Sequence, residues 1–184
     1  MTKPTIETVH TARLVLTRPV EHDLPDLLRM HRDPRVMATL GGLRSDAELA
    51  ALHEQLLAHW GRYGFGWWVA RLADGRFVGR GGLRSLTLEG VGAVEVGYGL
   101  VPEFWGQGLA TELAAESVRT GFDVLHLKAL VCFTLPENRA SRRVMEKGGF
   151  RYERDIVHAG LLHALYRLTA GQWRAAYRGG RSSG

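Results

Sequence analysis

One stretch of the sequence limits what the chain can fold into more than any other: residues 94–112, VEVGYGLVPEFWGQGLATE. Its first part, residues 94–100, alternates apolar residues with glutamate and glycine, which predicts a strand. Pro102 has no amide donor and ends that strand. Gly106 and Gly108 then make a glycine-rich turn, and an Ala-, Leu- and Glu-rich helix follows directly.

A strand, a glycine turn and a helix start together can bind a phosphate group. The first amides of a helix have no acceptor within the helix, and the helix dipole adds partial positive charge there. Glycine lets a diphosphate approach the backbone closely. Two other phosphate motifs are absent, because there is no Gly-Lys-Ser/Thr and Thr111 stands where GxGxxG requires its third glycine. A glycine helix cap without any ligand remains the alternative interpretation.

The turn resembles the acetyl-CoA loop of the GNAT acetyltransferase superfamily, which reads Gln/Arg-x-x-Gly-x-Gly/Ala. The corresponding residues here are 103–108, EFWGQG. The sequence PEFWGQGLATE is most similar to that of the RimJ/RimL-type branch, which includes N-terminal acetyltransferases of ribosomal proteins. Glu103 departs from the family's Gln/Arg, so the resemblance gives its side chain no role.

A second block, residues 135–150, carries the same resemblance. GNAT members commonly read Asn-x-x-Ala/Ser-x-x-Leu-Tyr-x-x-x-Gly-Phe at this point. The matching positions here are Asn138, Ser141, Val144, Met145, Gly149 and Phe150. The two blocks stand in the family's order and spacing. With the C-terminal LYRLTAGQW they extend the resemblance over nearly the whole chain.

The local patterns predict one domain over residues 1–176, followed by a loose basic tail over 177–184. We expect an α/β (α+β) fold: a mixed, largely antiparallel sheet flanked by helices. The GNAT resemblance implies that one strand pair of this sheet is splayed. Residues 1–11 are expected to be loose. The expected strands cover residues 14–16, 65–72, 77–88, 94–100, 129–133, 151–159 and 161–168. The expected helices cover residues 23–32, the segment capped by Ser45 and Glu48 and ended by Gly61 and Gly64, the segment after Gly108, and 136–147.

The amino-acid composition limits the kinds of partner and the redox compartment that suit this chain. The single cysteine, Cys132, excludes a disulfide framework and a cysteine-rich metal site, and suits a reducing cytoplasm. No apolar run approaches the length of a membrane span. The net charge of +5 suits either a polyanionic cofactor or a nucleic acid. A nucleic-acid-binding module is thus a rival interpretation, which a row of basic residues supports: Arg139, Arg142, Arg143 and Lys147.

The resemblance implies that acetyl-CoA lies where the strand at 94–100 splays from the strand at 129–133. Strand amides near Leu100 and Val101 would then bond the pantetheine arm, which satisfies groups that are costly to bury alone. Asn138 would bond the pantetheine too, although Asn is also a common helix N-cap. The diphosphate would lie on a run of loop residues: Gly106, Gln107, Gly108, Leu109, Ala110 and the Thr111 hydroxyl.

The chemistry would be direct attack of a neutral amine on the thioester, with a thiolate leaving. In many GNAT enzymes a tyrosine protonates that thiolate, but Met145 holds its position here. Ser141, one helical turn earlier, is the substitute candidate. Two alternatives stay open: the thiolate leaves to solvent, and Ser141 is only a packed helix residue.

Glu95 is the leading candidate for the base that takes the proton of the amine, because it faces away from Val94 and Val96 on the strand beside the cofactor. A salt-bridged strand residue is the alternative. Three histidines have suitable intrinsic pKa values but no recognisable partner, and a water chain would also suffice: His126, His158 and His163.

Two further features have structural interpretations. Cys132 lies between apolar residues without a nearby histidine, which favours a buried core thiol over an acyl-carrying nucleophile. Trp67 and Trp68 could line an acceptor pocket, and since neighbours on a strand face opposite ways we expect only one to be buried.

The sequence therefore predicts an acetyl-CoA-dependent N-acetyltransferase that acts on a primary amine: a peptide or protein N-terminus, an amino acid, an antibiotic or a polyamine. The alternatives are a catalytically weak acyl-CoA sensor, suggested by Met145, and the nucleic-acid-binding module. We expect a monomer or a homodimer, no membrane association and no metal. The acceptor itself is not readable from the sequence.

Overall fold

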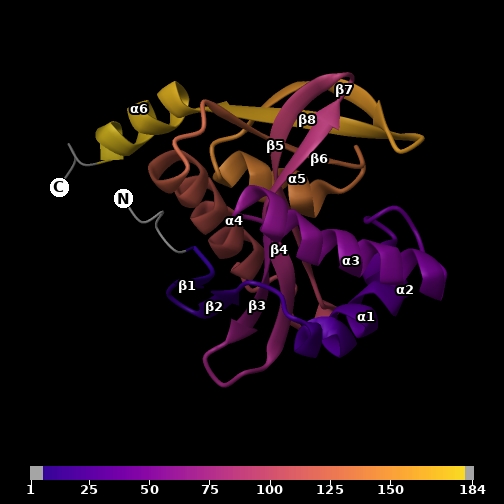
Figure 1. The fold of residues 1–184 in the computed structure, drawn as a ribbon. Helices are drawn as coiled ribbons and strands as arrows, with labels where there is room; N and C mark the ends of the chain where they lie inside the picture. Colours follow the sequence, from indigo (N-terminus) through magenta and orange to yellow (C-terminus); the bar gives the residue numbers. More distant parts are fainter. Residues whose placement is uncertain (1–5, 181–184) are drawn as a thin grey trace.

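The computed structural model describes the backbone of residues 6–180 and the side chains of residues 6–176, and one eight-stranded sheet runs through it (Figure 1). The strand order is β1-β2-β3-β4-β5-β6-β8-β7, and every neighbouring pair is antiparallel except β5 and β6. The strands are β1 (Thr8–His10), β2 (Leu14–Thr17), β3 (Trp67–Leu72), β4 (Phe77–Leu88), β5 (Val91–Leu100), β6 (Ala129–Thr134), β7 (Arg151–His158) and β8 (Leu161–Thr169). The expected mixed, largely antiparallel sheet is confirmed.

Six α-helices flank this sheet in the described part of the chain: α1 (Leu24–Arg32), α2 (Pro34–Met37), α3 (Asp46–Tyr63), α4 (Leu109–Arg119), α5 (Arg139–Lys147) and α6 (Ala170–Gly180). Short 3-10 turns cover Glu21–Asp23 and Pro102–Phe104, and a π-helical turn over Thr120–Val124 follows α4. Ser45 caps α3, and its reciprocal bond with Glu48 confirms the expected capping box.

Helices cover both faces of the sheet, as the alternation along β3 shows. Trp68 and Ala70 pack with Leu109 and Leu113 of α4, whereas Val69 packs with α1 and α2. Successive strand residues point to opposite faces. In Figure 1, α1, α2 and α3 lie together at the right, and α4 lies at the left.

β5 and β6 diverge after a single registered pair, Glu95 with Val131. On its other side β6 pairs with β8 along its whole length, from Ala129 to Thr134. The last part of β5, residues 96–100, therefore has a strand neighbour on the β4 side only. This is the splayed strand pair that the sequence predicts.

Several element boundaries differ from the prediction. Residues 8–10 form the edge strand β1, because their backbone pairs with β2, which a local pattern does not reveal. Gly61 lies inside α3, which ends at Gly64 in a left-handed conformation. α5 begins at Arg139, since the side chain of Asn138 caps it. Residues 177–180 continue helix α6 instead of forming a loose tail, and residues 181–184 lie outside the described residues.

Trp67 and Trp68 are both buried, so the expectation that only one is buried was wrong. They do point to opposite faces, but helices cover each face. Trp68 donates to the carbonyl of Ile6 at 2.7 Å inside the cluster beneath α4. Trp67 lies against Gly97, where an added Cβ would be 2.9 Å from the indole ring.

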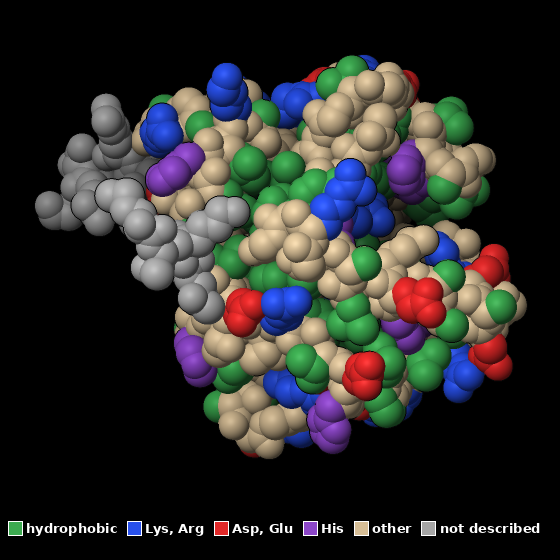
Figure 2. All heavy atoms as spheres, viewed as in Figure 1, with side chains coloured by type: hydrophobic (Ala, Val, Ile, Leu, Met, Phe, Trp, Pro, Cys, Tyr) green, Lys and Arg blue, Asp and Glu red, His purple; other side chains and the backbone are tan. Residues whose placement is uncertain are grey.

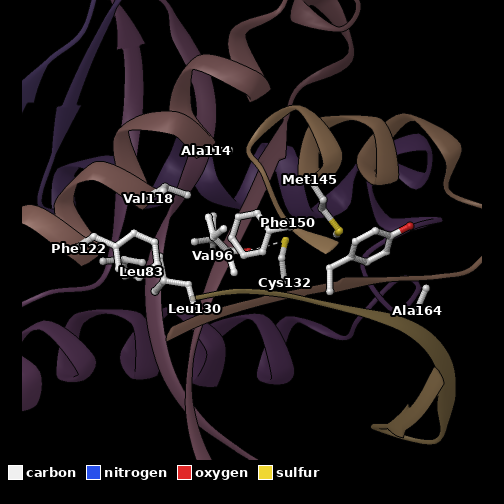
Figure 3. Packing of buried hydrophobic residues seen from close by; sticks show 12 residues of the cluster. Leu83, Val96, Ala114, Val118, Phe122, Leu130, Cys132, Met145, Phe150 and Ala164 are labelled. Carbon is white, nitrogen blue, oxygen red and sulfur yellow. Dashed lines mark hydrogen bonds between the residues drawn. The ribbon is translucent and has the colours of Figure 1, made fainter. Parts of the chain in front are cut away.

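The cluster between α4, α5 and the sheet contains two residues of the second sequence block, Met145 and Phe150 (Figure 3). Met145 points from α5 into this cluster, beside Cys132, and only 2% of it is exposed. The methionine at the family's tyrosine position is thus a core residue. Cys132 is buried as expected, and its thiol donates to the carbonyl of Val96.

Candidate active site

The loop between β5 and α4 presents its backbone to solvent. Gly106 and Gly108 have φ angles of 73° and 78°, a left-handed conformation that glycine adopts without strain. An added Cβ on Gly106 would meet nothing within 4 Å. Residues 105–108 are exposed, whereas Leu109 is buried and anchors the start of α4. The loop is therefore open to a ligand.

The backbone amides of residues 106–111 have no acceptor within the described chain, and Glu112 is the first residue of α4 whose amide is bonded, to the carbonyl of Gly108. Gly108 is the N-cap and has no side chain to satisfy these donors. Several free donors and the positive end of the helix dipole face the same space. An acetyl-CoA diphosphate fits this arrangement because it supplies the missing acceptors.

Arg13 belongs to this loop, which sequence reasoning missed. Its guanidinium donates to the carbonyl of Gln107 at 2.8 Å and pairs with Glu112 at 2.7 Å. Its second terminal nitrogen lies 3.5 Å from where a Cβ of Gly108 would stand. Burial alone would raise the pKa of Glu112, but hydrogen bonds from Thr11 and Arg13 outweigh it and lower that pKa. A cation thus lies beside the open amides.

The sheet split exposes a different set of amides from the one expected. The amide of Val101 donates to the carbonyl of Val78 at 3.0 Å, so its expected role as a free donor was wrong. Along an antiparallel ladder, bonded groups alternate between the two sides of a strand. The amides of Leu100 and Tyr98 therefore point toward the gap beside β6. The pantetheine contact of the Leu100 amide stays a prediction, and the Tyr98 amide faces the gap where the Val101 amide does not.

Tyr98 also brings its side chain to Ser141. The phenol oxygen lies 2.9 Å from Ser141 Oγ and 3.1 Å from the Ser141 carbonyl, and in the hydroxyl pair either group can donate. Burial, with the Cys132 thiol nearby, raises the pKa of Tyr98, so the phenol stays protonated at neutral pH. The predicted candidate Ser141 thus has a hydroxyl partner that the sequence did not reveal.

Asn138 is the N-cap of α5. Its side-chain oxygen accepts from the amide of Ser141 at 3.2 Å, and its nitrogen donates to Thr134 at 3.0 Å. The capping interpretation is therefore observed. Contact with pantetheine stays a prediction, since one N–H of the side-chain amide is still free for it.

Glu95 is buried and paired. Both Nε and a terminal nitrogen of Arg84 donate to Oε2 of Glu95, at 2.8 and 2.6 Å, while no hydrogen bond within the described residues engages Oε1. Gly97 and Gly99 share the face of β5 on which Glu95 lies, the face that α1 and α3 cover. This is the salt-bridged alternative, and it leaves one carboxylate oxygen for a proton.

A pocket of about 280 Å³ lies beside this pair, between α3, β4 and β7. Arg84, Trp67 and His158 are among its lining residues. Burial lowers the pKa of His158, and Arg84 acts in the same direction, so this imidazole is neutral at pH 7. His59 also lines the pocket, but Phe65 and Ser85 occupy both of its ring nitrogens.

The remaining candidates are structural or apart from this site. Burial raises the pKa of Cys132, and the nearby Glu95 acts in the same direction, so a thiolate nucleophile is disfavoured. His126 is exposed after α4, and His163 packs against Phe133 and His158. Among residues 6–180, no group of three or more His, Cys, Asp or Glu is placed to hold a metal ion. No helix in that range is long and apolar enough to cross a membrane.

The sheet is split at its one parallel pair, and the start of α4 presents open amides, an arrangement that suits an acyl-CoA ligand. The sequence matches the acetyltransferase (GNAT) domain family over residues 13–151. The chain belongs to this family.

The relatives and neighbouring structures agree on the family. The FsC-acetyl coenzyme A-N(2)-transacetylase of Aspergillus fumigatus is 36% identical over 155 residues, which are 79% of this chain and 65% of that protein. The chain therefore spans somewhat less than two thirds of this relative. An acetyltransferase from Agrobacterium tumefaciens superposes with a TM-score of 0.80 at 27% identity, over 89% of this chain and 94% of that one.

A structure of RimL, a ribosomal L7/L12 α-N-protein acetyltransferase in complex with coenzyme A, superposes with a TM-score of 0.71 at 18% identity, over 89% of this chain and 98% of that one. At this identity the likeness extends to the fold alone. The GNAT resemblance is therefore confirmed, and the RimJ/RimL-type branch is not.

Proposed function

We propose that the protein transfers the acetyl group of acetyl-CoA to a primary amine in a single displacement. The main support for this proposal is the run of unpaired amides at residues 106–111. These residues follow β5, the strand that diverges from β6. The diphosphate accepts from these amides and from Arg13. The pantetheine accepts from the amides of Tyr98 and Leu100, within reach of Asn138.

In this proposal the amine nitrogen bonds to the thioester carbon, the C–S bond breaks, and the sulfur leaves as a thiolate. Ser141 donates a hydrogen bond to that sulfur, and Tyr98 donates one to Ser141 through their 2.9 Å contact. The stabilised thiolate then takes its proton from solvent. The free oxygen of Glu95 takes the proton from the amine, directly or through water. His158 is the second candidate base, because it is neutral and lines the adjacent pocket.

The RimJ/RimL-type wording of the loop supports a peptide or protein N-terminus as one acceptor class, and small amines are the other. We expect the protein to act in the cytoplasm as a monomer or a homodimer. The sensor alternative predicts acyl-CoA binding without turnover. The nucleic-acid alternative has less support, because Figure 2 shows Lys and Arg scattered among acidic side chains on this face.

Thermal unfolding with ligands tests the loop assignment. Acetyl-CoA is expected to raise the melting temperature at concentrations at which inorganic phosphate does not. Equal shifts from both would show generic anion binding.

A matched pair of glycine variants shows whether a loss of acetyl-CoA affinity comes from backbone strain or from the loop itself. Gly106 and Gly160 have φ angles of 73° and 77°, and neither Cβ would meet an atom within 4 Å. Gly106→Ala should therefore weaken acetyl-CoA binding about tenfold or more, whereas Gly160→Ala should lose only stability. Equal affinities in the two variants would refute the loop assignment. Release of CoA in the presence of amines then separates an enzyme from a sensor.

A further inference from the structure

All the buried side-chain nitrogens and oxygens that lack a hydrogen-bond partner, among the residues whose side chains are described, belong to one group of four residues. These are Nδ1 and Nε2 of His31, Nε2 of His53, Nε1 of Trp67 and Nε of Arg80. The four residues are 3%, 4%, 8% and 6% exposed. Buried polar groups are nearly always paired in folded proteins. A concentration of unpaired groups in one place therefore indicates a missing partner.

These side chains form two pairs on the side of the sheet that α1 and α3 cover. The imidazoles of His31 and His53 have centroids 5.7 Å apart, and the Cζ atom of Arg80 lies 3.8 Å from the centroid of the Trp67 ring. The charge of Arg80 acts directly on His31. We call this group, His31, His53, Trp67 and Arg80, the donor cluster.

The donor cluster has no anion of its own. Arg80 forms no ion pair within the described residues, and Glu95, the carboxylate whose charge acts on it, is already held by Arg84. The other charges that act on Arg80 are the cations Arg84 and Arg44. The indole and guanidinium nitrogens can only donate. The neutral imidazoles of His31 and His53 each offer one donor and one acceptor nitrogen. The cluster thus contains more donors than acceptors and an excess of positive charge.

We propose that the donor cluster binds a carboxylate of the acceptor, so that the acceptor is a primary amine that also carries a carboxylate. This inference rests on the proposed function, since it names the acceptor of that transfer. A carboxylate is planar and accepts two bonds from a guanidinium, which would satisfy the donors of the cluster. A polyamine or another polycationic amine would meet Arg80, Arg84 and Arg44 with like charge.

The position of Trp67 connects this cluster to the proposed reaction centre. The Cζ atom of Arg84 lies 4.7 Å from the same ring centroid, so the two guanidinium carbons are separated by no more than the sum of the two distances. Arg84 holds Glu95, the candidate base. One small molecule can therefore present its amine to Glu95 and its carboxylate to Arg80.

Three matched acceptors test the proposal by CoA release: phenylalanine, phenylalaninamide and phenethylamine. The first is expected to have a kcat/KM at least about tenfold higher than the other two. Two peptide amides that differ only by Asp or Asn at the second position then identify the source of the carboxylate. A preference for Asp assigns it to a peptide side chain, and a preference for the free amino acid over both peptides assigns it to a small molecule. Equal rates throughout overturn the proposal.

Variants of Arg80 test whether the preference for a carboxylate depends on the donor cluster. Arg80→Met should reduce the preference for the carboxylate to about threefold or less through KM, and Arg80→Lys should retain part of it. Arg62→Met is the matched control, since Arg62 also stacks on an aromatic ring, that of Tyr63, but on an exposed part of α3. An unchanged preference in Arg80→Met would overturn the assignment. If Arg80→Met does not fold, the same comparison is made with Arg80→Lys.

A binding measurement separates this inference from the proposed function. The protein, alone and with CoA, is titrated with N-acetylphenylalanine and with its amide by calorimetry. Tighter binding of N-acetylphenylalanine than of its amide supports the donor cluster, whether or not any amine is acetylated. The absence of acetylation would refute the proposed function instead. Equal binding of the two compounds refutes the cluster even if acetyl transfer is observed.

Discussion

The phenol oxygen of Tyr98 on β5 lies 2.9 Å from the hydroxyl oxygen of Ser141 on α5. This contact joins β5 to the second sequence block, residues 135–150, at the point where the sheet opens. Met145 cannot donate a proton and is buried in the core, so in the proposed function these two hydroxyls take the place of the family's tyrosine. Burial raises the pKa of Tyr98, so the phenol keeps its proton and can donate a hydrogen bond toward a thiolate that forms beside Ser141.

Tyr98→Phe and Ser141→Ala are each expected to lower kcat by about ten- to a hundredfold. Their KM for acetyl-CoA should change less than about threefold, because neither hydroxyl carries the diphosphate. Groups that act as one unit give non-additive losses, so the double variant should be no slower than the slower single variant. Steady-state CoA release measures all three.

The control for this pair is Tyr152→Phe, which removes an exposed phenol that is bonded to Asp155. It should leave kcat unchanged. Fully additive losses in the double variant, or a loss of acetyl-CoA affinity equal to the loss of kcat, would show that Tyr98 and Ser141 do not form a relay.

Arg13→Gln is expected to weaken acetyl-CoA binding about thirtyfold, since one charge-assisted hydrogen bond to a phosphate is worth about 2 kcal/mol. The weakening should diminish as salt is added, because Arg13 is exposed and its charge is screened. Arg18→Gln is the control, as Arg18 follows β2 of the same hairpin and pairs with Glu7 away from the loop. Calorimetry at two salt concentrations measures both. Equal affinities in the two variants would remove Arg13 from the site.

The loop could be predicted because its signals are local. A strand pattern, Pro102, two glycines and a helix start are all contained in residues 94–112. Arg13 could not be predicted, since its bond to Gln107 spans 94 positions and depends on the edge hairpin of β1 and β2. Tyr98 was visible as a strand residue, but its bond to Ser141 depends on how α5 packs over the sheet.

To predict which amides are free, one must know the register of the strand pairing as well as the position of the strand. The sequence places residues 98–101 at the end of β5, yet which of them bond to β4 is decided by the pairing of Gly79 with Leu100. The burial of both tryptophans could not be predicted from the strand pattern alone. Alternation places Trp67 and Trp68 on opposite faces of the sheet, but only the fold shows that helices cover both faces. The donor cluster draws on α1, α3, β3 and β4, and none of its members forms a motif with another.

The protein is expected to lose stability as the pH falls below about 6.5. Burial, with the charges of Arg80, His53 and Arg44, lowers the pKa of His31 from 6.5 to about 3. The unfolded chain therefore binds a proton between these two values that the folded protein does not, so the free energy of unfolding decreases as the pH falls. His31 alone contributes a loss of about 2 kcal/mol between pH 6.5 and 5.

Denaturant unfolding at pH 7.5 and 5 measures this loss. His31→Leu should show a smaller loss than the wild type, while His22→Leu, at an exposed histidine before α1, should keep it. The pKa of His53 is also lowered by burial, so some acid sensitivity remains in His31→Leu. An unchanged pH dependence in His31→Leu would show that this imidazole is not kept neutral.

Two arginines on one indole are expected to have opposite effects on stability. Arg80 stacks on Trp67 without an anion, and burial, together with Arg84, lowers its pKa to about 9. At neutral pH the folded protein therefore holds an unpaired buried cation, and Arg80→Met should raise the free energy of unfolding by about 1–3 kcal/mol in the absence of acceptor. Arg84 stacks on the same ring but pairs with Glu95, so Arg84→Met leaves a buried carboxylate unpaired and should lower it by about 3 kcal/mol. Denaturant unfolding at pH 7.5 decides the signs. A loss of stability in Arg80→Met would show that the charge of Arg80 is satisfied within the fold, and the acceptor carboxylate would then have no reason to bind there.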